Sequence, residues 1–176
     1  MTNDRRPAIV AAARDILERD GPDGLTMRAI AKAVGIRAPS IYKHFPDKAA
    51  LEVELIAAGL AETAAAFETA VADAPDPIAA LAATYRAWAL DHPHLYRLIN
   101  DRPLPRERLP AGLEARAAQP LLEAVGGDLA RARATWGLAH GLTSLELADR
   151  FPDDADLAKA WAAGTAALSV RRIRRR

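Results

Sequence analysis

Residues 25–55 read LTMRAIAKAVGIRAPSIYKHFPDKAALEVEL, and this stretch decides the fold. Thr26 has the residue type and position of an N-cap for a helix that runs through Val34. Gly35 suits the left-handed residue that follows a helix end, and Pro39 suits the first turn of the next helix. The stretch therefore predicts two short helices joined by a tight turn, which form a helix-turn-helix when a supporting helix precedes them.

A supporting helix is predicted immediately before this stretch. It runs from Arg5 to about Asp20 and ends at the turn sequence Gly-Pro-Asp-Gly, residues 21–24. A long fourth helix is predicted to follow Asp47, which has the residue type of an N-cap. Apolar residues recur at helical spacing in both helices, namely Ile9, Ala13, Ile16 and Leu17 in the first and Leu51, Leu55, Ala58 and Ala65 in the fourth.

The rest of the chain predicts further helices. Ala and Leu favour helix and are abundant, whereas runs of β-branched residues are scarce. The expected helices cover about 76–91, 95–100, 113–125, 128–150 and 153–170, with a bend at Pro120 and a proline-rich loop at 101–112. We therefore predict an all-α fold with a helix-turn-helix domain at 1–48, a helical body at 49–170 and a basic tail at 171–176.

The composition excludes several classes of protein. The chain has 176 residues, 51% of them hydrophobic, and no cysteine, so disulfides, thiolate metal sites and cysteine nucleophiles are excluded. Its longest uncharged apolar runs are shorter than the ~20 residues that span a bilayer, and the N-terminus lacks a signal-peptide pattern. No catalytic constellation, metal site or cofactor motif is recognised. We expect a cytoplasmic protein that is not an enzyme and has no membrane partner.

Charge is distributed unevenly along the chain. The net charge is +1, but residues 1–48 carry nine Lys or Arg against six Asp or Glu, a balance of +3. The tail RRIRRR adds +5, so the segment between them carries about −7. A basic head on an acidic body favours a head that meets a polyanion such as DNA.

The second helix of the motif, APSIYKH (38–44), carries the candidate DNA-reading side chains. In a helix-turn-helix this helix enters the major groove and the preceding helix crosses the backbone. Ile41 and Phe45, four residues apart, would anchor the helix, while the Tyr42 phenol and the Lys48 ammonium would contact phosphates. The candidate DNA-binding residues are Thr26, Arg28, Arg37, Ser40, Tyr42, Lys43, His44 and Lys48.

Two stretches resemble the TetR (tetracycline repressor) family of bacterial transcription regulators. The head is similar at Leu25-Thr26, Ile30-Ala31, Val34-Gly35, the Ile41-Tyr42-x-His44-Phe45 run, Lys48 and Leu51. TWGLAHGLTSLEL (135–147) resembles the Trp-His-Gly signature of one C-terminal subgroup, here Trp136, His140 and Gly141. The resemblance implies a repressor that binds a palindromic double-stranded DNA operator as a homodimer, responds to a small organic ligand and needs no cofactor.

The resemblance also makes the body, 49–170, a ligand-binding and dimerisation domain. Aromatic and histidine side chains there would line a pocket for a neutral or weakly polar ligand, although they would equally suit a plain core. The candidate pocket residues are Tyr85, Trp88, His92, Tyr96, Leu121, Trp136 and His140.

The last two helices are the candidate dimer interface, because in this family these helices pair between subunits and small residues let helices approach closely. The alternative is that the same residues pack within one subunit. The candidate interface residues are Gly141, Leu142, Leu145, Leu157, Trp161, Gly164 and Leu168.

Several alternatives stay open at this point. The chain could be an all-α small-molecule-binding or catalytic bundle with an incidental basic head, or an architectural protein that binds DNA without sequence preference. Arg28 could face solvent, Tyr42 and His44 could be ordinary surface residues, and Arg5 and Arg6 could form a minor-groove arm or move freely. The RRIRRR tail could be only solvated.

Overall fold

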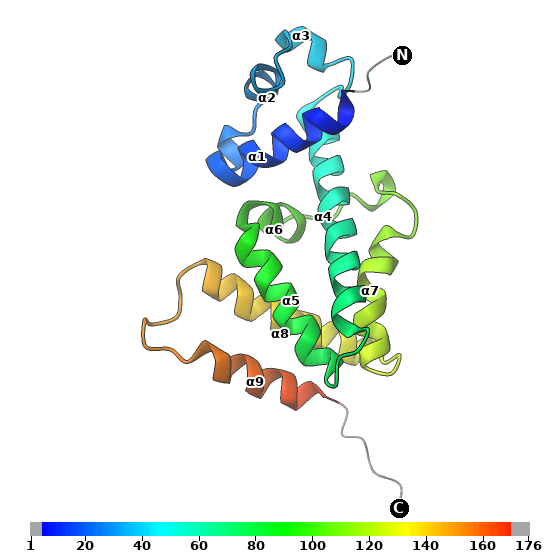
Figure 1. Cartoon of the computed structure of the whole chain (residues 1–176), viewed down its shortest axis with the longest axis vertical. Helices are drawn as coiled ribbons and strands as arrows, with labels where there is room; N and C mark the ends of the chain where they lie inside the picture. Colours follow the sequence, from blue (N-terminus) through cyan, green and yellow to red (C-terminus); the bar gives the residue numbers. More distant parts are fainter. Residues whose placement is uncertain (1–4, 170–176) are drawn as a thin grey trace, which may run out of the picture. The chain divides into compact units, whose positions relative to one another are not determined.

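The computed structural model describes residues 5–169, and all regular structure in that part of the chain is helical (Figure 1). The predicted all-α fold is confirmed. No helix within these residues is long and apolar enough to cross a membrane. The elements are α1 (Arg6–Gly24), α2 (Met27–Ala33), α3 (Ala38–Ile41), α4 (Lys48–Val71), α5 (Pro77–Asp91), α6 (Pro93–Asn100), the 3₁₀ turn η1 (Arg106–Arg108), α7 (Leu113–Ala124), α8 (Leu129–Leu147) and α9 (Leu157–Leu168).

The described residues form two compact units, which differ from the domains predicted with a boundary at residue 48. The first unit comprises residues 5–61 and 92–113, and the second comprises 62–91 and 114–169. Helix α4 contributes its first part to one unit and its last part to the other, while α6 belongs with the helix-turn-helix. The predicted basic tail, 171–176, lies outside the described residues.

Helix α1 supplies the core of the first unit, as the spacing predicted. Its Ile9, Ala13, Ile16 and Leu17 are all buried. The helix breaks at Gly21, whose φ of 71° and ψ of −175° are non-helical, and Pro22 opens one further turn that ends at Gly24. The predicted end near Asp20 therefore corresponds to this break, and the last turn follows it.

The turn between α2 and α3 is a helix end closed by Gly35. The Gly35 N–H donates to the Lys32 carbonyl at 3.2 Å, and the Ile36 N–H donates to the Ala31 carbonyl at 2.9 Å. Gly35 has a φ of +69°, and a Cβ placed there would meet no atom within 4 Å. This pair of bonds is the Schellman motif, so glycine is required here by backbone conformation and not by lack of space.

A side chain of α1 and a glycine of α4 position α6 in the first unit. Both carboxylate oxygens of Glu18 accept backbone N–H groups at the start of α6, from His94 at 3.1 Å and from Leu95 at 2.9 Å. These N–H groups lack partners within their own helix, so the acidic side chain caps the helix from a distance in sequence. On α4, a Cβ added to Gly59 would lie 2.7 Å from Cδ1 of Ile99, so this glycine lets α6 side chains reach the α4 backbone.

In the second unit, α5 packs against α8 and α9. Its core holds Ala82, Ala139 and Trp161, with Tyr85, Leu142 and Leu157 packed against them. Arg86 of α5 and Glu146 of α8 form a two-pronged ion pair, in which the guanidinium Nε donates to the carboxylate at 2.8 Å. The side-chain hydrogen bond to Glu146 raises the pKa of Arg86 above its usual range, so Arg86 keeps its positive charge.

Two predicted helix ends near residue 150 are wrong. Helix α8 stops at Leu147 because Asp149 adopts a left-handed φ of 52° and Arg150 N–H donates to the Leu145 carbonyl at 3.0 Å. Aspartate tolerates this conformation, so the helix ends without the glycine that would have marked it. Helix α9 begins at Leu157 rather than near Asp153, because Asp156 accepts the Lys159 N–H at 3.1 Å as its N-cap.

The first prediction concerns the glycine turn. Gly35→Ala should lower the free energy of unfolding by about 1 kcal/mol, because a Cβ in the left-handed region is strained. Gly35→Asn should cost less, since asparagine adopts this region more readily. Urea unfolding of the three proteins measures both effects, and an alanine variant as stable as the parent would contradict the prediction.

Candidate nucleic-acid interface

The predicted recognition helix is short and held by one buried stripe. Helix α3 spans Ala38–Ile41, and turn bonds continue it, with His44 N–H and Phe45 N–H both donating to the Ile41 carbonyl at 2.9 and 3.0 Å. Ile41 is 0% exposed and Phe45 is 1% exposed. The expected anchoring role of these two residues therefore agrees with their burial.

The residues between and around this stripe face outward. Tyr42 is 52% exposed, which is unusual for a large aromatic side chain. Within residues 5–169, the side chains of Arg28, Arg37 and Lys43 make no hydrogen bond or ion pair, so their charges are unneutralised. Of the eight candidates, Thr26, Arg28, Arg37, Tyr42 and Lys43 are exposed, and Ser40, His44 and Lys48 are half-buried.

Thr26 acts as the predicted cap of α2. Its Oγ1 accepts the Ala29 N–H at 3.1 Å. The cap fixes where α2 begins, and helix N-termini present unpaired N–H groups that attract phosphate. A structural role and a DNA-facing role are compatible at this residue.

Lys48 has intramolecular partners that the sequence did not indicate. Its Nζ donates to the Pro22 carbonyl at 3.0 Å and lies 3.7 Å from Glu52 one turn along α4. The first contact joins the start of α4 to the last turn of α1. Because an ammonium carries three donors, the same group retains a donor for a phosphate oxygen.

The structure gives Arg6 a role that the sequence did not predict. The sequence left open only a free side chain or an arm in the minor groove. Its guanidinium lies 4.4 Å from the centre of the Phe45 ring. One nitrogen donates to the His44 carbonyl and another to Glu54, both at 2.6 Å. Arg6 therefore ties α1 and α4 to the end of the recognition helix and is not a free arm. No local pattern in the sequence marks a contact between residues 38 and 48 positions apart.

The candidate pocket residues are divided between the two units. His92 and Tyr96 belong to the first unit, where Tyr96 is 1% exposed. In the second unit Trp136 is 52% exposed, and its ring lies 6.2 Å from that of His140. Tyr85 stacks at 6.4 Å on Phe67, a residue missing from the predicted set. Tyr85, Trp88, Leu121 and His140 are half-buried.

The candidate interface residues also separate into two groups. Trp161 is buried in the core of the second unit, Leu142 and Leu157 pack against that core, and Leu168 is half-buried. A Cβ on Gly164 would lie 2.7 Å from Cδ2 of Leu138, so its small size serves the packing of α9 on α8 in one chain. Gly141 has open space where a Cβ would lie, and Leu145 is 44% exposed.

A second prediction concerns the Arg6 tie. Arg6→Ala should lower the free energy of unfolding by about 1 kcal/mol, since it removes a ring contact and charged hydrogen bonds that are only half-shielded from water. Amide exchange at His44 and Phe45 should accelerate, because the end of the recognition helix loses its support. Native-state hydrogen exchange measures the effect residue by residue.

The matched control is Arg5→Ala, which removes the same charge one position earlier. The side chain of Arg5 is exposed and makes no hydrogen bond or ion pair within the part of the chain that the structure describes. Equal exchange rates at Phe45 in the two variants would show that the loss of charge, and not the tie, is responsible.

Two family models match the chain. Residues 9–55 match the model described as bacterial regulatory proteins, tetR family, and residues 78–168 match that of the tetracyclin repressor-like C-terminal domain. The second match alone covers more than half of the chain. Its description carries no Trp-His-Gly feature, so that finer assignment stays a prediction.

Individual relatives agree with these matches. The chain is 42% identical over 62 residues to the tetracycline repressor protein class A from transposon 1721 of Escherichia coli, which covers 35% of this chain and 29% of that protein. It is 28% identical over 131 residues to an HTH-type transcriptional regulator of Mycobacterium bovis, covering 69% of this chain and 56% of the relative. The chain thus spans 29% to 56% of the length of these relatives.

Solved structures match over nearly the whole chain. SCO4313, solved as a regulatory protein, is 30% identical with a TM-score of 0.75, and the match covers 93% of this chain and 94% of that one. The multidrug binding protein EbrR, at 22% identity and a TM-score of 0.69, shares the fold over 95% of this chain and 96% of its own. The predicted resemblance is confirmed, and the chain belongs to the TetR family of bacterial regulatory proteins.

Proposed function

We propose that this protein is a ligand-responsive transcriptional regulator that binds a palindromic operator as a homodimer and acts as a repressor. The observation that carries the proposal is the surface around α3, where Arg28, Arg37 and Lys43 have no internal partners and Tyr42 is exposed beside them. Three unneutralised cations around an anchored helix are suited to phosphates and base edges. The relatives are described as transcriptional regulators, which supports a protein that is not an enzyme and that works in the cytoplasm, where bacterial DNA lies.

The rival bundle with an incidental basic head is less favoured. It offers no reason for an exposed Tyr42 together with the uncompensated charges of Arg37 and Lys43 at the two ends of one short helix. The architectural alternative differs only in specificity, so it is separated by experiment. Footprinting on the DNA that flanks the gene should reveal one protected inverted repeat, whereas an architectural protein should protect no preferred site.

The third prediction separates base contacts from backbone contacts. Lys43→Ala should reduce operator preference at particular base pairs by about 1–3 kcal/mol, because Lys43 is unpaired on the recognition helix. Lys48→Ala should weaken binding to every duplex alike and lower the slope of log K against log salt by about one, as the loss of one phosphate contact does. Binding measured over a series of salt concentrations and single-base operator variants distinguishes them.

The structure suggests an alternative explanation for any effect of Lys48 on DNA binding. Lys48 could act only by joining α4 to the Pro22 carbonyl. In that case Lys48→Ala would lose affinity with an unchanged salt slope and would also lower the thermal midpoint. That result would make Lys48 a positioning residue. For Lys43, an even loss of affinity at all base pairs would assign it to the phosphate backbone.

Dimerisation is proposed through one face of α8, with α9 behind it. Gly137, Gly141 and Leu145 repeat every four residues, so they lie on one side of the helix. Neither glycine would bring a Cβ within 4 Å of another atom of this chain, and Leu145 is 44% exposed. An apolar helix face with small residues, and with open space beside both glycines among residues 5–169, fits close approach of a second copy.

The fourth prediction tests that face. Leu145→Glu should place a charge in the proposed interface and shift the dimer towards monomer in analytical ultracentrifugation, with weaker operator binding as a consequence. Leu90→Glu is the matched control, since Leu90 is 38% exposed but belongs to α5 and is not one of the residues of the proposed face on α8. Gly164→Trp is a poor probe, because Leu138 of the same chain already fills the space beside it.

A parent protein that is monomeric at micromolar concentration would contradict the proposed dimer. So would a Leu145→Glu variant that remains dimeric, since a glutamate cannot be buried there without a partner.

Ligand response is proposed for the second unit, which holds five of the seven predicted pocket residues, Tyr85, Trp88, Leu121, Trp136 and His140. Two solved relatives of the same fold contain small molecules, EbrR with imidazole and a TetR variant of Acinetobacter baumannii with minocycline. Tyr85, Trp88 and His140 are half-buried there, as residues at the wall of a pocket can be. Their mixture of apolar rings and few polar atoms favours a neutral or weakly polar organic ligand.

The fifth prediction is that such a ligand weakens operator binding. A coupling of ~1–3 kcal/mol would change operator affinity by about 5–150-fold. A panel of neutral aromatic compounds, screened by competition with labelled operator, measures this effect. Compounds that bind the second unit yet leave operator affinity unchanged would contradict the proposed switch.

A further inference from the structure

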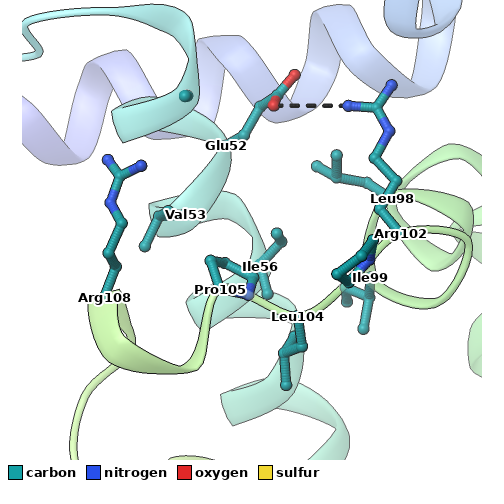
Figure 2. A pocket seen from close by; sticks show the side chains of 11 residues that line it. Glu52, Val53, Ile56, Leu98, Ile99, Arg102, Leu104, Pro105 and Arg108 are labelled. Carbon is teal, nitrogen blue, oxygen red and sulfur yellow. Dashed lines mark ion pairs between the residues drawn. The ribbon is translucent and has the colours of Figure 1, made fainter.

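A pocket lies within the first unit, and its lining includes none of the residues predicted to line a ligand site. It is bounded by the first half of α4, the end of α6 and the loop that follows α6, and its volume is about 150 Å³ (Figure 2). Its apolar wall is built by Val53, Ile56, Leu98, Ile99, Leu104 and Pro105. A cavity of ~150 Å³ with aliphatic walls is large enough to hold a benzene ring.

Two arginines stand on opposite sides of this apolar wall in Figure 2. Arg102 is paired only loosely, because its Nη1 lies 3.8 Å from the Glu52 carboxylate, which is longer than a hydrogen bond. The Arg108 side chain makes no hydrogen bond or ion pair with any residue in the range 5–169. The pocket therefore combines an apolar wall with two guanidinium groups whose donors are largely unused.

The three charged side chains that line the pocket carry a net charge of +1, from two arginines and Glu52. One monovalent anion would bring this charge to zero. A guanidinium offers parallel N–H donors that match the two oxygens of a carboxylate, and such charged hydrogen bonds are stronger than neutral ones. We also expect the anion to have an apolar part, because an apolar group gains free energy by covering the aliphatic wall and water does not.

We propose that this pocket binds a small monocarboxylate whose apolar part is about the size of one six-membered ring. The apolar part lies against Ile56 and Ile99, and the carboxylate accepts from Arg108, which has no acidic partner of its own within residues 5–169. Arg102, on the opposite side, lies beside Glu52 and adds to the positive charge of the pocket. This site differs from the proposed ligand site of the second unit in its place in the chain, its charge and its ligand class.

The position of Glu52 connects the pocket to the start of α4. Glu52 lies 3.7 Å from Lys48, which donates to the Pro22 carbonyl of α1. Any effect on operator affinity rests on the proposed function, so the test measures binding to the protein without DNA.

Benzoate is the probe, and benzyl alcohol is its uncharged match. In protein labelled at Ile, Leu and Val methyl groups, benzoate should give saturable NMR shifts at Val53, Ile56, Ile99 and Leu104. Benzyl alcohol should bind at least about tenfold more weakly, because it lacks the charged hydrogen bonds. Shifts confined to methyl groups of the second unit, or equal affinity for both compounds, would overturn the proposal, as would the absence of benzoate binding at millimolar concentration.

Variants test the assigned donors. Arg108→Gln should weaken benzoate binding about tenfold. Arg106→Gln is the matched control, because it removes the same charge from the same 3₁₀ turn but does not line the pocket. An equal loss of benzoate affinity in the two variants would show that the positive charge of the loop attracts benzoate without a specific site, and this would overturn the proposal.

Both variants should keep the parent's thermal midpoint, since both arginines are exposed. Operator binding of the same proteins without benzoate is measured in parallel. Failure of the carboxylate site would leave that binding intact, whereas failure of the proposed function would remove operator binding and leave benzoate binding unchanged.

Discussion

The arrangement of the first unit depends on one buried contact, the side chain of Phe45 beneath the guanidinium of Arg6. A helix of four residues cannot hold its own shape in water, so α3 takes its conformation from what it is packed against. Ile41 and Phe45 fix which side of the chain turns inward, and helical spacing then turns Tyr42 and Lys43 outward. The outward position of the residues proposed to meet DNA is therefore a consequence of this anchor.

A second constraint explains why residues far along the chain belong to the same unit. The Glu18 carboxylate accepts two N–H groups at the start of α6, which the α6 sequence leaves uncapped because His92 provides no side-chain cap. A carboxylate at a helix N-terminus also meets the positive end of the helix dipole. The two hydrogen bonds join residues 76 and 77 positions apart, so one side chain of α1 connects that helix directly to the start of α6. A boundary drawn at residue 48 overlooks this connection.

The features that the sequence predicted well are local. Thr26 and Asp47 cap helices through neighbours three residues ahead, and Gly35 closes a turn through bonds within five residues. The features that it missed depend on side chains brought together by folding, as with Arg6 on Phe45. Asp149 was missed for another reason, because a left-handed residue other than glycine gives no distinctive signal. Gly164 shows the same limit, since a small residue fits a partner helix in its own chain as well as one in a second copy.

The cations of the first unit fall into two groups, those with a hydrogen-bond or ion-pair partner in the described part of the protein and those without one there. Arg6 and Lys48 donate hydrogen bonds to backbone carbonyls and lie beside carboxylates, and Arg102 forms a long ion pair with Glu52. Arg28, Arg37, Lys43 and Arg108 have no such partner within residues 5–169. An unneutralised charge in a folded protein gains most from an external anion, because no internal contact has to be broken first. The first three lie on or before the recognition helix, where phosphates and bases would meet them. Arg108 instead borders an apolar pocket, which is why its anion is expected to carry a hydrophobic part and to be something other than DNA.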